Sequence, residues 1–311
     1  MMNEKLKGGL LVFFGGCSFG LLSTIVKSAY GVGYNVGQIT GTQTLLGVVI
    51  LWSIYLLQKQ FKPKTIKLKL KEGQTKPTPL WKVILAGSFT GLVGIFYYNS
   101  VNYIPASIAI ILLMQYLWIS IIIEWVWFKK RPHKMQVIAA LIVFIGTLFA
   151  GGIFNDKLEV LDPKGIFYGF LAAICYSIFL MTSGRVGNEY PVFKKSALMI
   201  TGSMTLTWII FPPLFLIDGT FFDGLYKWGL ALALLGTVTP PLFFSSGIPR
   251  VGVSLGAILS ASELPVAVTA SHFILKEDVQ GLQWLGVALI LSAIALTNLK
   301  TTSKKNSEVQ A

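Results

Sequence analysis

Residues 251–275 read VGVSLGAILSASELPVAVTASHFIL, a run of 25 residues in which Glu263 is the only Asp, Glu, Lys or Arg. About 20 apolar residues in a helix suffice to cross a hydrocarbon layer of ~30 Å. Because a lone segment in lipid must satisfy its own backbone hydrogen bonds, we interpret this stretch as a transmembrane helix. Charged residues form only 13% of the 311-residue chain, about half their usual share in soluble domains.

Apolar blocks of this length recur along the chain and predict an all-α integral membrane protein with ten transmembrane helices. The expected spans are residues 8–29, 36–57, 82–103, 105–128, 134–153, 165–183, 196–217, 227–246, 251–275 and 280–299. A membrane barrel would instead show segments of about ten residues with alternating hydrophobicity, a pattern that this sequence lacks. The remaining loops leave no room for an additional soluble domain.

The distribution of positive charge explains the net charge of +13. With the N-terminus inside the cell, 21 of the 26 Lys and Arg residues fall in cytoplasmic segments, including the basic linker 59–82. This asymmetry follows the positive-inside rule and predicts a multi-pass protein of the inner (cytoplasmic) membrane with both termini cytoplasmic. Because this asymmetry accounts for the positive charge, we expect no nucleic-acid partner. The expected partner of the apolar surface is the lipid bilayer.

The sequence contains an internal repeat. Residues 94–146 align without gaps on 241–293 at an offset of 147, with seven identities in 53 positions. We therefore expect a first repeat over residues 1–153, a second over 154–299 and a cytoplasmic tail over 300–311. Each repeat holds five spans, and because five is odd, the second copy should be inverted in the membrane.

Several motifs resemble the EamA family of the drug/metabolite transporter superfamily. They are Ser-Glu-Leu-Pro at 262–265, Lys276-Glu277, Gln283-x-x-Gly286, and in the first repeat Pro105-Ala106-Ser107, Gln136 and Gly146. Lys27 also matches a common family position. The resemblance implies ten helices in two inverted repeats. It further implies an exporter or permease for small metabolites such as amino acids.

Glu263 is the strongest candidate for a functional residue, because a carboxylate at the centre of a span costs at least ~2.5 kcal/mol. We expect it to face the bundle interior and to accept a proton or a substrate ammonium. The alternative is a structural carboxyl group satisfied by neighbouring hydroxyls. Pro265, two residues later, should kink this helix and free a backbone carbonyl near Glu263.

Other polar and aromatic residues inside spans are candidates for the wall of a central cavity, with ordinary helix packing as the alternative for each. They are Gln115, Tyr116, Trp118, Tyr98, Asn99, Asn102 and Gln43. Lys27 either extends its ammonium to the outer headgroups or pairs with a carboxylate in the cavity. Pro240 and Pro241 should produce a further kink that could serve as a hinge.

The sequence lacks a metal-ligand cluster, a nucleotide-binding loop and a nucleophile elbow, so we expect no metal, no cofactor and no enzyme. The combined features predict a secondary transporter of a small polar or amphipathic metabolite, acting as a monomer or homodimer. Alternating access would provide the mechanism, with protons as candidate coupling ions. The alternatives are a passive, channel-like facilitator and an integral-membrane enzyme acting on lipid.

Overall fold

The computed structural model describes residues 4–61, 76–104, 106–129, 131–150, 162–274, 276 and 278–308, and every regular element in these ranges is a helix. The first half holds α1 (Glu4–Gly20), α2 (Leu22–Gly31), α3 (Val36–Phe61), α4 (Leu80–Tyr103), α5 (Ala106–Leu113), α6 (Tyr116–Phe128) and α7 (Lys134–Ala150). The second half holds α8 (Pro163–Arg185), α9 (Val192–Ile210), η2 (Leu214–Leu216), η3 (Phe221–Leu225), α10 (Tyr226–Leu232), η4 (Ala233–Val238), α11 (Thr239–Val251), α12 (Val253–Ser260), α13 (Glu263–Ile274) and α14 (Gly281–Glu308).

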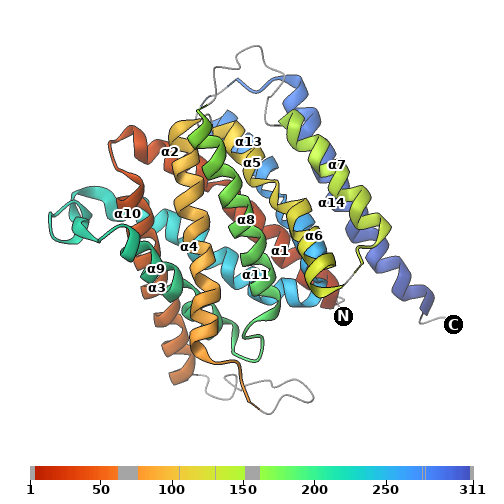
Figure 1. Cartoon of the computed structure of the whole chain (residues 1–311), viewed down its shortest axis with the longest axis horizontal. Helices are drawn as coiled ribbons and strands as arrows, with labels where there is room; N and C mark the ends of the chain where they lie inside the picture. The colour runs from red at the N-terminus through yellow and green to blue at the C-terminus, as the bar shows by residue number, and fades with distance from the viewer. Residues whose placement is uncertain are drawn as a thin grey trace.

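Most of the rods are long and apolar enough to cross a membrane. Seven segments of the described chain meet that requirement by length and composition, and two shorter apolar helices, Lys134–Ala150 and Gly281–Leu296, accompany them. The tenth rod is α9, which has 19 residues. Figure 1 shows these rods as one bundle, in which α1 begins and α14 ends toward the lower part.

Two expected spans differ from the structure. The span predicted over 196–217 is α9, which ends at Ile210 because the Pro212-Pro213 pair follows and cannot continue a helix. The span predicted over 227–246 is longer and runs from Phe221 to Val251. Its π-helical turn η4 ends at Val238, two residues before Pro240 and Pro241, where the two missing backbone N–H groups interrupt the regular hydrogen-bond ladder.

The third, fourth and fifth rods of the two halves match at an offset of 147 residues. The helix pair α5–α6 is interrupted at Met114 and Gln115, and the pair α12–α13 is interrupted at the equivalent positions, Ala261 and Ser262. Lys129 and Lys276, also 147 apart, both adopt the left-handed conformation, with φ of 51° and 58°. Since non-glycine residues rarely adopt this conformation, the agreement is strong support for duplicated halves.

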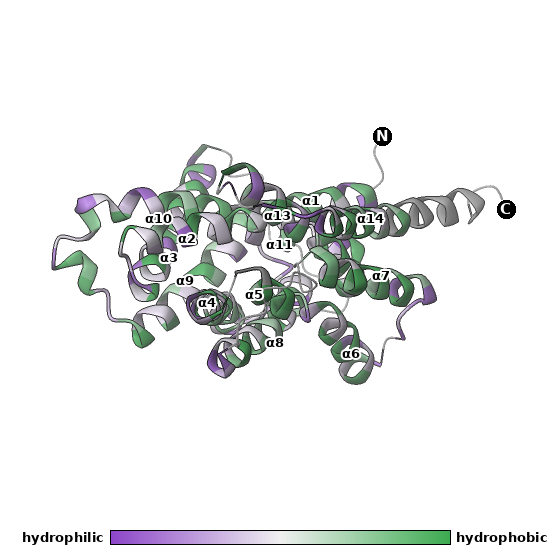
Figure 2. Cartoon of the chain, turned by 90° about the horizontal axis from the view of Figure 1, so that it is seen from above, coloured by the Kyte–Doolittle hydropathy of each residue, from purple (hydrophilic) through white to green (hydrophobic). Residues whose placement is uncertain are grey.

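The two halves are interleaved rather than separate. The most extensive helix pairings are α4 with α9, α4 with α8, α7 with α14, α1 with α11, and α3 with α9. Every one of these pairs joins a helix of the first half to a helix of the second. Seen from above, α7 and α14 lie together at one edge, beside the larger group formed by the other rods (Figure 2).

Glycine allows the closest of these approaches, between α4 and α9. A Cβ atom on Gly87 would lie 1.9 Å from the carbonyl oxygen of Met199, and one on Gly202 would lie 1.9 Å from that of Ile84. The two backbones are therefore in contact without intervening side chains. Small residues at helix interfaces are typical of membrane bundles, where such contact replaces the hydrophobic effect as a source of association.

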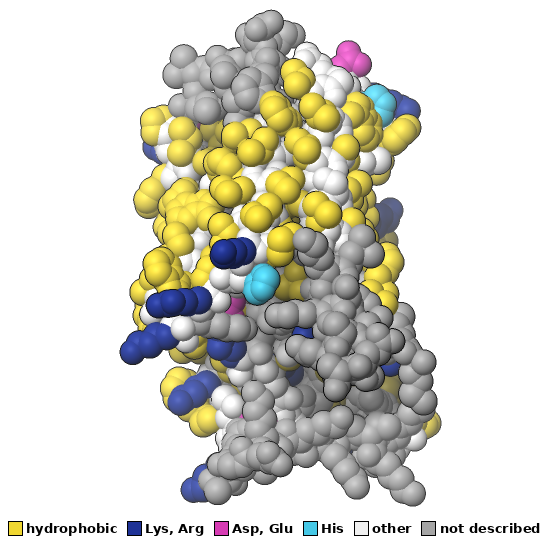
Figure 3. Space-filling view, turned by 90° about the vertical axis from the view of Figure 1, so that its right-hand side faces the viewer, with side chains coloured by type: hydrophobic (Ala, Val, Ile, Leu, Met, Phe, Trp, Pro, Cys, Tyr) yellow, Lys and Arg dark blue, Asp and Glu magenta, His cyan; other side chains and the backbone are white. Residues whose placement is uncertain are grey.

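The outer surface is apolar in the manner of a lipid-facing protein. Large exposed side chains include Phe167, Ile209, Phe222, Trp127 and Leu141. On the face seen in Figure 3, hydrophobic side chains cover the upper part, whereas Lys and Arg side chains gather toward the lower part. A soluble monomer rarely exposes so many large apolar side chains, and their exposure agrees with a membrane environment.

Candidate functional site

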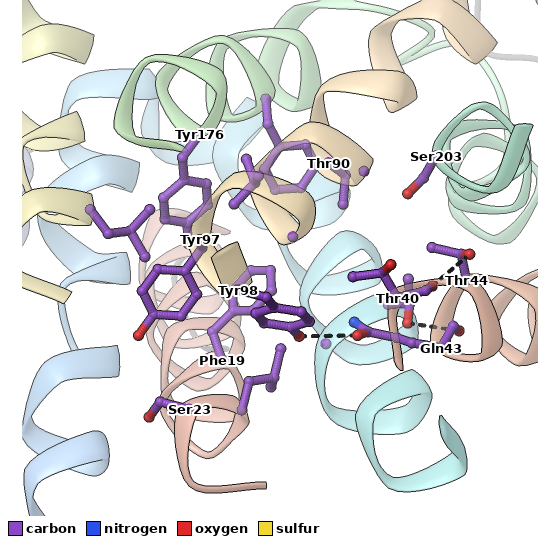
Figure 4. A pocket seen from close by; sticks show the side chains of 18 of the residues that line it. Phe19, Ser23, Thr40, Gln43, Thr44, Thr90, Tyr97, Tyr98, Tyr176 and Ser203 are labelled. Carbon is purple, nitrogen blue, oxygen red and sulfur yellow. Dashed lines mark hydrogen bonds between the residues drawn. The ribbon is translucent and has the colours of Figure 1, made fainter. Parts of the chain in front are cut away.

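A cavity of about 60 Å³ lies inside the bundle, between helices of both halves (Figure 4). Its polar lining consists of Ser23, Thr40, Gln43, Thr44, Thr90, Ser203, Thr207, Thr237 and Glu263. Its aromatic lining consists of Phe19, Tyr97, Tyr98, Tyr176 and Phe179. Such a mixture of flat apolar walls and a few polar groups is typical of small-molecule sites.

Glu263 is the acidic group of this cavity. It is the first residue of α13, and its side chain is 3% exposed. The Tyr176 hydroxyl donates a hydrogen bond of 3.3 Å to Glu263 Oε2, whereas Oε1 has no hydrogen-bond partner among the described residues. A buried carboxylate oxygen without a partner is costly, so this atom is available to a proton, a water molecule or a ligand.

The interruption between α12 and α13 places Glu263 at the start of α13, beside the cavity. Ser262 N–H bonds the Leu259 carbonyl at 3.3 Å and Leu264 N–H bonds the Ala261 carbonyl at 3.2 Å, so the chain tightens to an i→i−3 pattern there. Pro265 has no N–H with which to bond the Ala261 carbonyl, but Leu264 N–H bonds this carbonyl instead, so the carbonyl is not freed as the sequence led us to expect. Helix α1 packs directly against this turn, since a Cβ on Gly20 would lie 2.3 Å from the Glu263 carbonyl oxygen.

Tyr176 links the two interrupted helices. The ring of Tyr116, the first residue of α6, lies edge-on to the Tyr176 ring at 4.4 Å between centroids. Tyr116 and Glu263 are equivalent under the offset of 147, and both therefore contact the same side chain of α8. The Tyr116 hydroxyl also shares a hydrogen bond of 2.9 Å with Ser260 Oγ of α12, which ties the two interruptions together.

On the opposite wall, Tyr98 of α4 donates a hydrogen bond of 3.0 Å to Gln43 Oε1 of α3. This bond is drawn in Figure 4, where the Tyr98 ring and the Gln43 amide face each other. The Gln43 side chain is 8% exposed and Tyr98 is 2% exposed. The bond uses the amide oxygen of Gln43 and leaves its Nε2 group as a donor toward the cavity.

Several hydroxyl groups of the lining have no partner in the described part of the chain. They are Thr90 Oγ1, Ser203 Oγ and Thr207 Oγ1. Together with Glu263 Oε1 they are four polar atoms around one cavity whose hydrogen bonds are not satisfied by the described residues. Buried polar atoms in native proteins are rarely left unsatisfied, and those that are suggest a missing water or ligand. The arrangement can therefore hold a polar solute.

The remaining predicted residues lie outside the cavity lining. Gln115 and Trp118 bond each other, with 2.7 Å between Trp118 Nε1 and Gln115 Oε1. Gln115 Nε2 also donates to the Ile111 carbonyl at 2.9 Å. Because the Gln115 backbone N–H bonds Leu112 instead, this side chain satisfies a carbonyl that the interruption has freed.

Two predicted amides and one cation are also away from the cavity. Asn99 Nδ2 donates to the Ile95 carbonyl at 2.8 Å within its own helix, a local bond that competes with a ligand contact. Asn102 and Lys27 are exposed, and neither lines the cavity. Thus the structure brings Glu263, Tyr98 and Gln43 to the cavity, with Tyr116 directly behind Tyr176.

Sequence reasoning missed Tyr176 and most of the hydroxyl groups. A signal was present, because Thr40, Gln43 and Thr44 are three and four residues apart and share one face of α3. Ser203 and Thr207 are likewise four apart on α9. Tyr176 had no such partner in sequence, since its role depends on residues of α6 and α13 that only the fold brings near.

Comparison with known proteins identifies the fold and the class. The model of the EamA-like transporter family matches residues 6–152 and 163–299. The chain belongs to the EamA-like transporter family. It is 24% identical to the uncharacterized transporter sll1319 of Synechocystis sp., with 97% of this chain and 96% of that protein aligned. It is 26% identical to the uncharacterized inner membrane transporter YicL of Salmonella typhimurium over 60% of this chain and 62% of that protein.

A solved crystal structure with 16% identity superposes with a TM-score of 0.71, covering 95% of this chain and 98% of the other, and thus has the same fold. Membership in the EamA-like transporter family makes this chain a multi-pass membrane transporter rather than an enzyme. A transporter of this family implies a small-molecule substrate, for which the cavity around Glu263 is the candidate site.

Proposed function

We propose that this protein is a secondary transporter that moves a small polar or amphipathic metabolite, such as an amino acid, by alternating access. The observation that carries the proposal is the buried Glu263 carboxylate in a cavity between duplicated halves, with one oxygen unpartnered in the described chain. The family resemblance implies an exporter or a permease.

Two inverted halves supply the symmetry that alternating access requires. The charge pattern supports this arrangement, because the matched turns at Lys129 and Lys276 fall on opposite sides when the N-terminus is cytoplasmic. The matched interruptions at 114–115 and 261–262 are suited to bending, since they lack a continuous α-helical ladder. Pro265, Pro240 and Pro241 add further points where the helices can flex.

Glu263 has a defined part in this mechanism. When ionised, it would attract a substrate ammonium or a proton into the cavity, and neutralising it would lower the cost of closing apolar walls around it. Tyr176 would hold the carboxylate in place through its hydroxyl group. Gln43 Nε2 and the hydroxyl groups of Thr90, Ser203 and Thr207 would bind the polar part of the solute.

The test is counterflow of labelled alanine, glutamine and phenylalanine in proteoliposomes, measured with and without an imposed pH gradient. We expect saturable counterflow of at least one of these solutes, and acceleration by the gradient. Glu263→Gln should abolish the acceleration. Asp218→Asn makes the same chemical change in an exposed loop and should leave it intact.

Two results would contradict the proposal. Unsaturable flux with no counterflow would indicate a passive facilitator. An unchanged response to the pH gradient in Glu263→Gln would exclude proton coupling through this residue, although the substrate-binding role could then be measured separately by its KM.

A further inference from the structure

A second cavity, of about 400 Å³, lies at the other ends of α3 and α9, two of the helices that line the first one. Its wall includes Gln58 of α3, Ser245 and Arg250 of α11, and Asn188, Glu189 and Tyr190 from the turn between α8 and α9. Both halves of the chain therefore contribute to it. The Glu263 cavity shares the helices α3, α9 and α11–η4 but none of these residues.

The second cavity presents both signs of charge. Arg250 Nε lies 3.2 Å from Glu4 Oε2, and Arg250 NH1 donates to the Ser246 carbonyl at 3.1 Å. Because Glu4 is largely exposed, that pair is solvent-screened and can be exchanged for another carboxylate. Glu189 is 5% exposed and accepts a hydrogen bond from the Thr78 backbone N–H. The Lys195 ammonium lies near this carboxylate as well.

Two neutral polar atoms of this wall are buried and have no partner within the described ranges, Gln58 Oε1 and Ser245 Oγ. Ser245 is 5% exposed. These atoms come from different halves of the protein, and both belong to the lining of one cavity. As in the Glu263 cavity, unsatisfied buried groups around an open volume suggest a polar occupant.

An apolar cluster separates the two cavities. It consists of Leu51 of α3, Ala197 and Ile200 of α9, and Val238 at the end of η4, and all four are buried. On α3 the order is Thr44, Leu51 and Gln58, with seven residues and about 10 Å of helix between successive members. The other two rods show the same order of first cavity, cluster and second cavity. On α9 the three residues are Ser203, Ile200 and Phe193, and along η4 and α11 they are Thr237, Val238 and Ser245.

We propose that the second cavity is a vestibule that binds a small zwitterion, and that the apolar cluster is the gate between it and the Glu263 cavity. Arg250 binds the carboxylate of the solute, Glu189 binds its ammonium, and Gln58 and Ser245 complete the hydrogen bonds. A charged solute does not cross the apolar cluster unless α3, α9 and η4 move apart. This inference rests on the proposed function. It adds the cavity through which the solute enters and the statement that the solute is a zwitterion.

The test uses Ser245→Cys in a chain whose Cys17 and Cys175 are replaced by Ala, labelled by a membrane-impermeant methanethiosulfonate in sealed vesicles of known orientation. We expect labelling from the face that carries the chain termini. Alanine, glutamine or phenylalanine should slow it, whereas the singly charged probes choline and acetate should not. Labelling that no zwitterion slows, or that acetate slows equally, would overturn the proposal.

Matched variants separate binding from structure. Arg250→Gln and Glu4→Gln both break the same surface pair, but only the first removes the guanidinium. We expect Arg250→Gln to weaken zwitterion protection about tenfold and Glu4→Gln to leave it unchanged. Equal loss in both variants would show that the pair acts only through structure.

The gate is tested by Leu51→Ala, which should increase labelling of Ser203→Cys from the terminus-bearing face. Unchanged labelling would overturn the assignment of the gate. Glu263→Gln should leave protection of Ser245→Cys intact. Counterflow without protection would refute the vestibule alone, whereas protection without counterflow would refute the proposed transport function alone.

Discussion

Arg185 at the end of α8 donates a hydrogen bond of 2.9 Å to Glu124 in the last turn of α6. The Glu124 carboxylate also accepts bonds from the backbone N–H of Ser254, at 3.0 Å, and from the Ser254 hydroxyl at the start of α12. One buried acid thus joins a helix of the first half to two helices of the second. The Arg185 guanidinium lies over the Phe128 ring at 3.7 Å, which shields the pair from water on one side.

Replacing Arg185 with Met should destabilise the protein, because the buried Glu124 carboxylate would lose the hydrogen-bonded Arg185 guanidinium. Breaking such a pair costs about 3–5 kcal/mol when both partners are buried, and we expect the lower end here because Arg185 is 35% exposed. The double variant Glu124→Gln, Arg185→Met should recover part of the loss. The measurement is unfolding in detergent followed by circular dichroism, and additive effects of the two changes would contradict the coupling.

Gly87→Ala should prevent correct packing of α4 against α9. The added Cβ would meet the Met199 backbone, which cannot rotate away as a side chain could, so the loss should exceed the about 1–3 kcal/mol of ordinary overpacking. Gly31→Ala is the matched control, because no atom lies within 4 Å of a Cβ there. Yield of monodisperse protein in detergent gives the comparison, and equal yields for both variants would be inconsistent with the close approach.

Gln115→Leu should lower stability without changing the KM for transport. The substitution removes the amide that bonds the Ile111 carbonyl and leaves a polar group unsatisfied, at a cost of about 1–3 kcal/mol. Thermal unfolding measures the stability of the variant, and counterflow kinetics measure its KM. A raised KM at unchanged stability would instead place Gln115 in contact with the substrate.

Acidification should loosen the turn between α8 and α9 through Glu189. Burial alone would favour the neutral acid, but hydrogen bonds from Thr78 and the nearby Lys195 ammonium hold the pKa of Glu189 below its ordinary value of 4.5. The ionised form therefore contributes stability that is complete above 4.5 and is lost as the pH falls through the lowered pKa. Glu189→Gln should show a smaller fall of Tm on acidification than the parent chain, and an identical fall would exclude this contribution.

The sequence was sufficient for the number of rods and for the repeat, but not for the bounds of two spans beside proline pairs. Apolar length identifies a span whatever its neighbours are, and the offset of 147 found by alignment is the one at which the helix interruptions recur. The interruption at Met114 and Gln115 was not predictable, since Trp118 stands where Pro265 stands in the second copy. The proline is thus not required for the interruption, which the packing around Tyr116 and Gln115 supports equally well.

The same reasoning explains which site residues were found. Glu263 was predictable because a charge in an apolar block has few structural explanations. Amides such as Gln115 and Asn99 were not, because an amide satisfies a nearby backbone carbonyl as readily as it binds a ligand. Only the tertiary structure distinguishes these two uses.

The spacing between the copies also bears on ancestry. Residues 106, 116, 129 and 134 have their counterparts at 253, 263, 276 and 281, so neither copy has a net gain or loss of residues relative to the other across this region. Divergence since the duplication has therefore proceeded here by exchange of side chains alone. Glu263 and Tyr116 then occupy positions that descend from one ancestral position. Glu263 now supplies a charge to the cavity, and Tyr116 now packs against Tyr176.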